Sequence, residues 1–426
     1  MHMLDFMLNR REHKAIMKLL AALLALMLTL PCALGEMTRE EVRAAWRDAT
    51  ALENMPYAIK PQVSAPYQPG RLTEATLEGA LRSLNFMRTL AGLDPVRGSE
   101  IYNYQCQHAA VLLAALDFVD HNAPRPADMD KNFYDSAHIG TSSGNIARFN
   151  WMRDSILREG VEYFARDDGD QNLPMLGHRR WLLNPEMSAT GFGLANAASG
   201  MSYVVMYAHD LGNRSAQWDH VAWPAAGLFP AELMHDHLAW SVSLNPAVYD
   251  LENSRPEVTL TEPALGLAFH FRPAESTGDG FCRVNLEPYG AGGCIIFRPD
   301  FADTGFTDYQ QNQRWAVDIR GLKGADGAEK TLTYEVEMIS LYPQDPANIE
   351  ITPLEASLKP GEGMAMSASV IPAYADDLSV TWTTSDPGVA TVDEYGNVTA
   401  LTPGACDITC TDALGHADTC RLTVTE

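Results

Sequence analysis

The side chains best suited to metal or acid–base chemistry fall in four short segments of the first half of the chain. These segments cover residues 120–124, 143–147, 164–167 and 177–185. They supply two histidines, His121 and His178, and one aspartate, Asp167. Imidazole and carboxylate groups bind Zn²⁺ and transfer protons. Each of the three also has a structural interpretation, as a loop histidine, a helix-capping histidine and a solvated helix end.

Other kinds of catalytic site find little support. The sequence has no G-x-S-x-G elbow and no H-E-x-x-H helix. Cys106 lies in an apolar stretch and is interpreted as a buried small hydrophobe. His235 and His237 could bind a metal together, but they lie at what reads as a domain junction. The aromatic run at residues 221–230, which includes Trp223, is interpreted as packing between domains, with glycan or peptide binding as the alternative.

Helices are predicted around these segments. Residues 38–41 form a capping box that starts a helix reaching about residue 54, and a Pro-rich linker follows up to residue 74. Apolar residues at every third or fourth position predict helices over residues 76–90, 99–118, 155–166 and 176–183. Residues 119–150 read as irregular, and residues 191–193 and 201–207 read as two strands.

The four segments, taken in order, resemble the CAP superfamily of cysteine-rich secretory, venom-allergen and pathogenesis-related domains. The specific part is the G-H-R, N-P and G-F-G block at residues 177–193, and the resemblance covers about residues 75–210. It implies an α-β-α sandwich whose cleft is lined by two histidines and two acidic residues, which bind a divalent metal in some members.

Carried over by position, the resemblance assigns His121, Asp167 and His178 to this cleft. Asn145 and Trp181 would be structural residues of the same domain. Gly144 stands where the family has its first glutamate, so one carboxylate is missing. The resemblance therefore implies weak binding of Zn²⁺ or another divalent cation at most, and an incomplete acid–base pair.

The sequence pattern of the second half of the chain is typical of β-strands. Short β-rich runs at residues 257–261, 266–271, 293–297, 315–319 and 331–340 predict a β-sandwich extension over residues 211–345. Residues 380–387, 389–393 and 396–400 carry a pattern that resembles the bacterial immunoglobulin-like group 2 domain, expected over residues 346–426 with Trp382 in its core. In that family the domain is a spacer or adhesion unit. Two local disulfides are predicted, Cys282 with Cys294 and Cys410 with Cys420.

Residues 1–35 read as a cleavable signal peptide. Lys18 precedes an apolar run at residues 19–30, and small residues at 33–35 place the cut before Glu36. Pro31 argues against lipid attachment at Cys32. The formal charge of −24 makes nucleic acid and anionic lipid unsuitable partners, and no later segment has the apolar length of a membrane span.

The sequence thus predicts a secreted or cell-surface multidomain protein. Its parts are the signal peptide, a helix and linker at residues 36–74, the α-β-α sandwich, the β-sandwich extension and the immunoglobulin-like β-sandwich. We expect non-enzymatic binding of a small ligand, a peptide, or a cell-envelope or host extracellular component. The alternatives are a metal-dependent hydrolase using His121, Asp167 and His178, and a glycan-binding adhesin.

Overall fold

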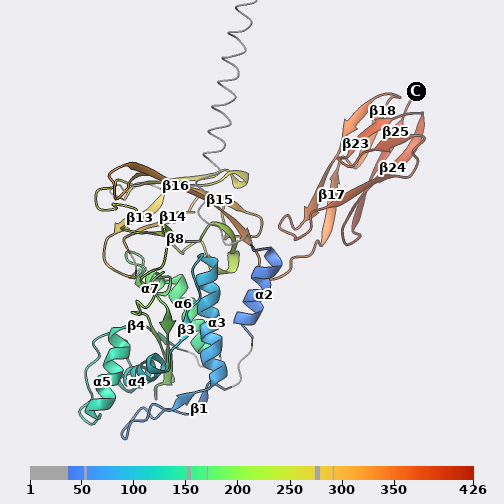
Figure 1. The fold of residues 1–426 in the computed structure, drawn as a ribbon. Coiled ribbons are helices and arrows are strands. Elements are labelled where there is room, and N and C mark those ends of the chain that lie inside the picture. Colours follow the sequence, from blue (N-terminus) through green and yellow to red (C-terminus); the bar gives the residue numbers. More distant parts are fainter. Residues whose placement is uncertain (1–36, 52–54, 151–154, 170, 274–278, 291) are drawn as a thin grey trace, which may run out of the picture.

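A computed structural model describes residues 37–51, 55–150, 155–169, 171–273, 279–290 and 292–426 (Figure 1). The predicted signal peptide and the cut before Glu36 lie outside these residues. Among the described helices, none has both the length and the apolar character needed to cross a membrane.

The first helix of the described residues is α2 (Arg39–Ala49). The side chains of Thr38 and Glu41 cap it reciprocally, which confirms the predicted capping box. The helix ends earlier than expected. The Pro-rich stretch that follows contains the short strands β1 (Tyr57–Ile59) and β2 (Arg71–Leu72), and it leads into helix α3 (Glu74–Leu90).

Three antiparallel strands form a small sheet in the order β4 (Gly144–Phe149), β7 (Ser202–Tyr207) and β6 (Phe192–Asn196). Helices α4 (Glu100–Leu116) and α5 (Lys131–Ser142) lie on one face, and α3 and α6 (Ile156–Arg166) lie on the other (Figure 1). Both faces of the sheet are apolar, with alternate residues of each strand facing opposite sides. Helix α7 (Gly177–Leu182) and the short strands β3 (Arg97–Gly98) and β5 (Ala189–Thr190) complete this helix–sheet–helix unit.

In this unit, glycines allow the backbone of a strand to lie very close to the backbone of a helix. A Cβ atom on Gly193 would lie 2.0 Å from the carbonyl oxygen of Cys106, and one on Gly191 would lie 2.3 Å from the backbone nitrogen of Asn103. The G-F-G motif therefore allows helix α4 to lie directly against strand β6.

The expectation that residues 119–150 are irregular is wrong for α5 and β4. The carboxylate of Asp130 caps α5 by accepting the backbone N–H groups of Asn132 and Phe133. This helix packs on α4 through Gly140, where a Cβ would lie 2.5 Å from the carbonyl oxygen of Gln105. Packing through a glycine leaves no leucine periodicity, which is why the helix escaped the sequence pattern.

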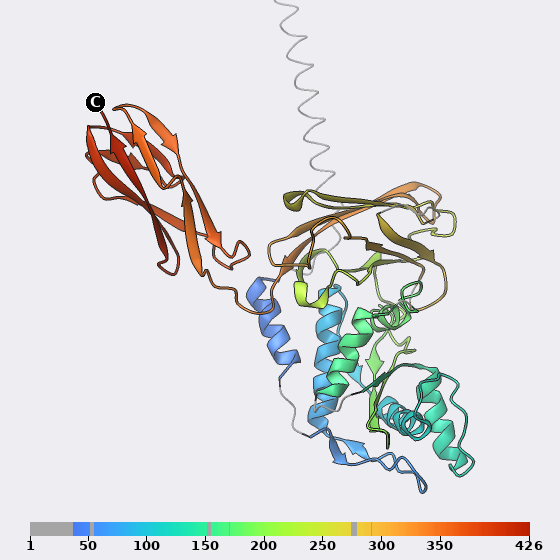
Figure 2. The same ribbon diagram turned by 180° about the vertical axis from the view of Figure 1, so that it is seen from behind.

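The β-sandwich extension consists of two sheets that pack face to face above the helices (Figure 2). Trp240 and Phe271 reach across between the sheets, with ring centroids 6.1 Å from Trp315 and 5.5 Å from Phe297. The first sheet has the order β13-β14-β10-β8 and the second has the order β12-β11-β15-β16-β9. Their strands are β8 (His220–Trp223), β9 (Gly227–Pro230), β10 (Trp240–Leu244), β11 (Glu257–Glu262), β12 (Leu267–Phe271), β13 (Gly280–Asn285), β14 (Cys294–Pro299), β15 (Arg314–Lys323) and β16 (Glu329–Ile339).

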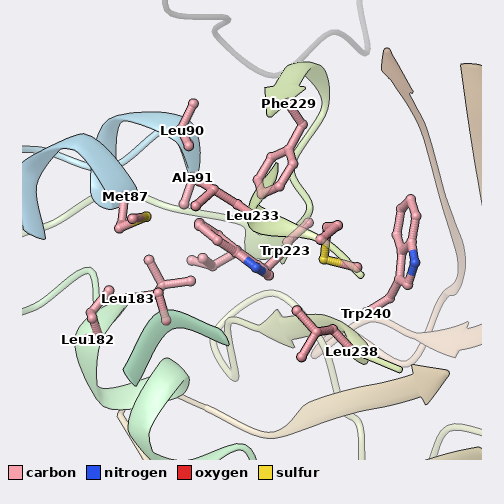
Figure 3. Packing of buried hydrophobic residues seen from close by; sticks show 14 of the residues in the cluster. Met87, Leu90, Ala91, Leu182, Leu183, Trp223, Phe229, Leu233, Leu238 and Trp240 are labelled. Atoms are coloured by element: carbon pink, nitrogen blue, oxygen red, sulfur yellow. The ribbon is translucent and has the colours of Figure 1, made fainter. Parts of the chain in front are cut away.

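One apolar core joins the helical unit to the extension (Figure 3). Met87 and Leu90 of α3 and Leu182 of α7 gather around Trp223, whose side chain is fully buried and meets Phe229 edge-on at 4.7 Å. The predicted boundary at residue 210 therefore falls inside a shared core. We call residues 39–345 the body.

The immunoglobulin-like unit has a core of its own. Trp382 is half-buried against it, and Gly396, at φ +82°, turns the chain between two strands beside that ring. The strands pair as β17-β20, β18-β25-β24-β21 and β19-β23-β22. They are β17 (Asn348–Thr352), β18 (Glu355–Leu358), β19 (Gly363–Ala365), β20 (Ser367–Ile371), β21 (Val380–Thr384), β22 (Ala390–Val392), β23 (Asn397–Ala400), β24 (Gly404–Asp412) and β25 (Ala417–Val424).

Neither predicted disulfide is present, and the cysteines of the described chain are free. Strands β13 and β14 place Cys282 opposite Phe297 and Cys294 opposite Asn285, three positions out of register. Strands β24 and β25 place Cys410 opposite Asp418 and Ile408 opposite Cys420, two positions out of register. A disulfide needs Cα atoms closer than these offsets bring them, so the sequence spacing was misleading.

Candidate functional site

Asp167 and His178 form a hydrogen-bonded pair at the ends of α6 and α7. Asp167 adopts a left-handed backbone conformation that ends α6, and its side chain is fully buried. One carboxylate oxygen lies 2.9 Å from His178 Nδ1, and the other accepts the backbone N–H of Arg179 at 3.2 Å. With both oxygens occupied and buried, Asp167 orients the imidazole and is not placed as a metal ligand.

His178 is held from several sides. The amide of Asn145, itself buried, donates to the carbonyl oxygen of His178 at 2.9 Å. The ring of Phe164 lies 5.2 Å from the imidazole. Because Nδ1 faces Asp167, Nε2 is the ring atom left for outside chemistry, and 19% of the side chain is exposed.

His121 lies at the same end of the small sheet, together with His209. His121 Nδ1 is 2.8 Å from the carbonyl oxygen of Thr141. The backbone N–H of His209 donates to the carbonyl oxygen of Ser143 at 3.2 Å, and Ser143 is two residues after Thr141. Burial lowers the pKa of His209, and the neighbouring His121 lowers it further. The ring of Trp181 packs on His209 at 4.1 Å. These contacts define a histidine cluster made of His121 and His209.

His209 escaped the sequence analysis. It lies two residues after the end of strand β7, and the pairing of Gly144 with Tyr207 brings it next to Ser143. The sequence signal for His209 was its position just after the predicted strand at residues 201–207. Using that signal requires the register of β4 and β7, which the sequence does not contain.

The residues of this region do not form the complete set of ligands that the resemblance implies. Across the described ranges, no group of three or more His, Cys, Asp or Glu side chains could hold a metal ion. At the place of the missing glutamate, a Cβ on Gly144 would lie 2.6 Å from the carbonyl oxygen of Gly140, so this backbone leaves no room for a side chain. Zinc binding by His121 and His178 stays a prediction.

A hollow of about 740 Å³ lies beside α6, and we call it the α6 hollow. Its aromatic lining includes Trp46 of α2 and Tyr163, whose ring is 6.5 Å from His178. Burial raises the pKa of Glu162, while its ion-pair partner Arg158 opposes that shift. The charged side chains that line the hollow are Arg148, Arg158, Arg166, Glu159, Glu162 and Asp168.

A second hollow of about 730 Å³ lies in the extension beside β14, and we call it the β14 hollow. Within the described chain, His235 and His237 beside it are no part of a metal-binding group. Their rings stack at 5.7 Å, and His235 Nδ1 is 3.0 Å from a carboxylate oxygen of Asp308. Its charged and aromatic lining includes Asp236, His237, Phe281, Arg298, Asp300 and Phe306.

Comparison with known proteins identifies the C-terminal unit. Residues 346–422 match the bacterial Ig-like domain (group 2), which confirms the prediction made for this part of the chain. A lacto-N-biosidase of Bifidobacterium bifidum is 38% identical over 101 residues, which are 24% of this chain and 8% of that protein. An A type blood N-acetyl-alpha-D-galactosamine deacetylase of Flavonifractor plautii is 26% identical over 178 residues, 37% of this chain and 21% of that protein.

The chain thus spans a small part of these relatives. Among solved structures, domains 4 and 5 of the S-layer protein SbsC align at a TM-score of 0.18 with 16% identity, covering 26% of this chain and 65% of that one. A likeness at this TM-score carries no argument about function. The findings together describe a multidomain protein, rich in β-sheet, with an immunoglobulin-like domain at residues 346–422 and local similarity to glycan-acting enzymes.

Proposed function

We propose that this chain is an extracellular carbohydrate-binding protein in which the body holds the glycan and the immunoglobulin-like unit serves as a spacer. The observation that carries the proposal is the α6 hollow. It combines guanidinium groups, carboxylates and aromatic rings in a volume of about 740 Å³. Ligand pockets for small molecules have volumes of roughly 300–1,000 Å³.

The lining of the α6 hollow suits a sugar. Arginine offers several N–H donors in a fixed plane, and carboxylates offer several acceptor positions, so together they can pair with the hydroxyl groups of a pyranose. The rings of Trp46 and Tyr163 offer apolar faces for the C–H side of the same ring. A ligand with hydroxyls on its edge and C–H groups on its face matches this lining.

Four further features support an extracellular glycan partner. The predicted signal peptide would direct the chain out of the cell, and the immunoglobulin-like family is expected on surface proteins. Two relatives that share part of the sequence are named as a biosidase and a galactosamine deacetylase. The charge of −24 disfavours polyanionic partners.

The proposal includes a CAP-like identity for residues 75–210. It is supported by the order of the His121, Asn145, Asp167 and His178 segments and by the packing of helices on both faces of a three-stranded sheet. Binding without catalysis is favoured because the carboxylate of the Asp167–His178 pair is buried and its second oxygen already accepts the backbone N–H of Arg179.

A metal-dependent hydrolase is the second candidate. It is favoured by the Asp167–His178 hydrogen bond, which leaves Nε2 of His178 available in the arrangement typical of metal-binding histidines. A titration with Zn²⁺ on the wild type and on His178→Ala tests it. Equal heats from both proteins would remove this candidate.

A glycan array probed with the mature chain tests the carbohydrate proposal. We expect neutral glycans to be retained and expect Tyr163→Ala to weaken binding about tenfold, equivalent to about 1.4 kcal/mol. Tyr395→Ala is the matched control, because Tyr395 is highly exposed in the immunoglobulin-like unit. An array without bound glycans, or equal binding by the Tyr163 and Tyr395 variants, would contradict the proposal.

A further inference from the structure

We infer that the ligand is an extended, uncharged oligosaccharide that runs from the α6 hollow across the Asp168–His237 pair into the β14 hollow. This inference rests on the proposed function and adds the length and charge class of the ligand. The two hollows belong to parts of the chain that are far apart in sequence, one in the helical unit and the other in the extension.

The two hollows meet at one pair of side chains. Asp168 lines the α6 hollow and His237 lines the β14 hollow, and His237 Nε2 lies 3.9 Å from a carboxylate oxygen of Asp168. Both side chains are about half exposed, at 46% and 54%, so the pair stands at the surface between the hollows. A chain molecule lying over the pair would contact both hollows together.

The spacing between the hollows is fixed by buried hydrogen bonds. Arg179 donates from Nε to the carbonyl oxygen of Ala165 at 2.7 Å and from Nη1 to that of Ala239 at 2.7 Å. These bonds hold the end of α6 against the start of β10. Arg298 donates to the carbonyl oxygen of His237 at 3.2 Å in an exposed hydrogen bond, which ties His237 to β14 within the extension. A preformed groove lowers the entropic cost of binding a long ligand.

The charge of the combined groove indicates an uncharged ligand. Four guanidinium groups and five carboxylates line the two hollows together, so the net charge of the groove is close to zero. The guanidinium groups belong to Arg148, Arg158, Arg166 and Arg298, and the carboxylates to Glu159, Glu162, Asp168, Asp236 and Asp300. A polyanion would need an excess of positive charge along its path. Aromatic rings at both ends, Tyr163 in one hollow and Phe281 and Phe306 in the other, offer stacking faces at two separated positions.

The test measures how binding depends on ligand length. N-acetylglucosamine oligomers serve as the uncharged probes, and titration calorimetry on the full mature chain compares the disaccharide, tetrasaccharide and hexasaccharide. We expect the hexasaccharide to bind at least tenfold more tightly than the disaccharide. Phe281→Ala and Asp300→Asn should each reduce hexasaccharide binding several-fold and leave disaccharide binding unchanged, because both side chains line only the β14 hollow.

Two variants make the result decisive. Tyr163→Ala should weaken all three probes, and Tyr395→Ala should weaken none. The conservative Asp300→Asn change guards against misfolding of the Phe281 variant, and equal thermal unfolding of all variants checks this. Binding that is independent of length, or hexasaccharide binding unaffected by both β14-hollow variants, would overturn the extended groove and leave the proposed function standing. Tight binding of a peptide or of a sulfated oligosaccharide with none of the N-acetylglucosamine series would overturn both.

Discussion

The junction between the helical unit and the extension differs from the junction between the body and the immunoglobulin-like unit. The first is an apolar core crossed by buried arginines: Arg180 donates to Asn285, Glu287 and Gly292 of the extension, and the guanidinium of Arg179 reaches Ala239. The second is mainly polar. Arg43 of α2 forms an ion pair with Asp376 at 2.7 Å, and Gln311 donates to the same carboxylate.

This difference shows that a change in the type of secondary structure along the chain need not mark the start of a new folding unit. The sequence changes from helical to β-rich near residue 211, yet the core passes through this point without a break. Near residue 346 one apolar core ends and another begins, and the sequence pattern of the immunoglobulin-like unit starts at the same place. A domain boundary is therefore indicated where apolar contacts end, and not where secondary structure changes type.

The largest expected effect breaks the first junction. Arg179→Met removes donors to the buried carbonyl groups of Ala165 and Ala239, and leaving buried acceptors unpaired costs about 1–3 kcal/mol for each group. We expect the body to lose about 3–5 kcal/mol. Calorimetric unfolding should show the body transition lowered and the second transition unchanged. In the control Arg421→Met, which removes an exposed pair with Asp407, neither transition should move by more than about 1 kcal/mol.

The second prediction concerns independence of the immunoglobulin-like unit. Residues 346–426 alone should unfold cooperatively, because their core involves no residue of the body. Trp382→Ala should destabilise this unit by about 2–3 kcal/mol, less than for a fully buried tryptophan because the ring is half-buried. Urea unfolding followed by fluorescence measures both. A fragment that stays disordered in NMR spectra would refute the independence of this unit.

The third prediction compares glycines in the two regions. Gly144→Ala places a Cβ against the carbonyl oxygen of Gly140 at 2.6 Å and should destabilise the body by about 1–3 kcal/mol. Gly388→Ala in the immunoglobulin-like unit meets only the side-chain oxygen of Asp386 at 3.2 Å, and this flexible group can move aside. Thermal unfolding should show a clear loss for the first variant and a small change for the second. Equal losses would mean that β4 has freedom to move.

The fourth prediction concerns the second junction. Arg43→Ala should lower the stability of the body by about 1–3 kcal/mol, because Arg43 is buried and also donates to Ser340 and Gln311, and it should leave the core of the immunoglobulin-like unit unchanged. Because the ion pair with Asp376 is lost as well, the variant should also broaden the distribution of distances between the body and the immunoglobulin-like unit. Small-angle scattering measures this change, and Arg47→Ala, on the same helix but paired with Glu40, is the control. An unchanged scattering curve would show that the ion pair does not fix the orientation.

The smallest expected effect concerns the histidine cluster. His121→Gln should raise the pKa of His209, because burial lowers that pKa first and the neighbouring His121 lowers it further. The folded-state pKa of His209 lies below the unfolded value of about 6.5, so the body loses stability as pH falls below that value. The His121→Gln variant should lose less stability than the wild type over the same pH range. NMR titration of the His209 ring measures the shift, and His416→Gln in the other region should leave it unchanged.

Much of the fold could be predicted because local signals agree with it. Thr38 and Glu41 capped α2 as expected, the periodicity found α3, α4 and α6, and the motif at residues 380–400 identified the immunoglobulin-like unit. Helix α5 was missed because it packs through Gly140 and carries no apolar stripe.

The candidate site could be predicted only in part. The pairing of Asp167 with His178 joins neighbouring elements, so a motif was able to suggest it. His209 depends on strand register, and the α6 hollow collects Trp46, Arg148 and Glu162 from three distant elements. Such groupings arise from tertiary packing, which no short window of sequence contains.

The central claim is that the body binds carbohydrate and the immunoglobulin-like unit does not. Titration of the N-acetylglucosamine hexasaccharide into the full mature chain and into residues 346–426 alone tests this claim most directly. We expect saturable binding heat from the full chain and no heat above dilution from the isolated unit. Equal affinity in both proteins would place the binding site in the immunoglobulin-like unit and would contradict the account.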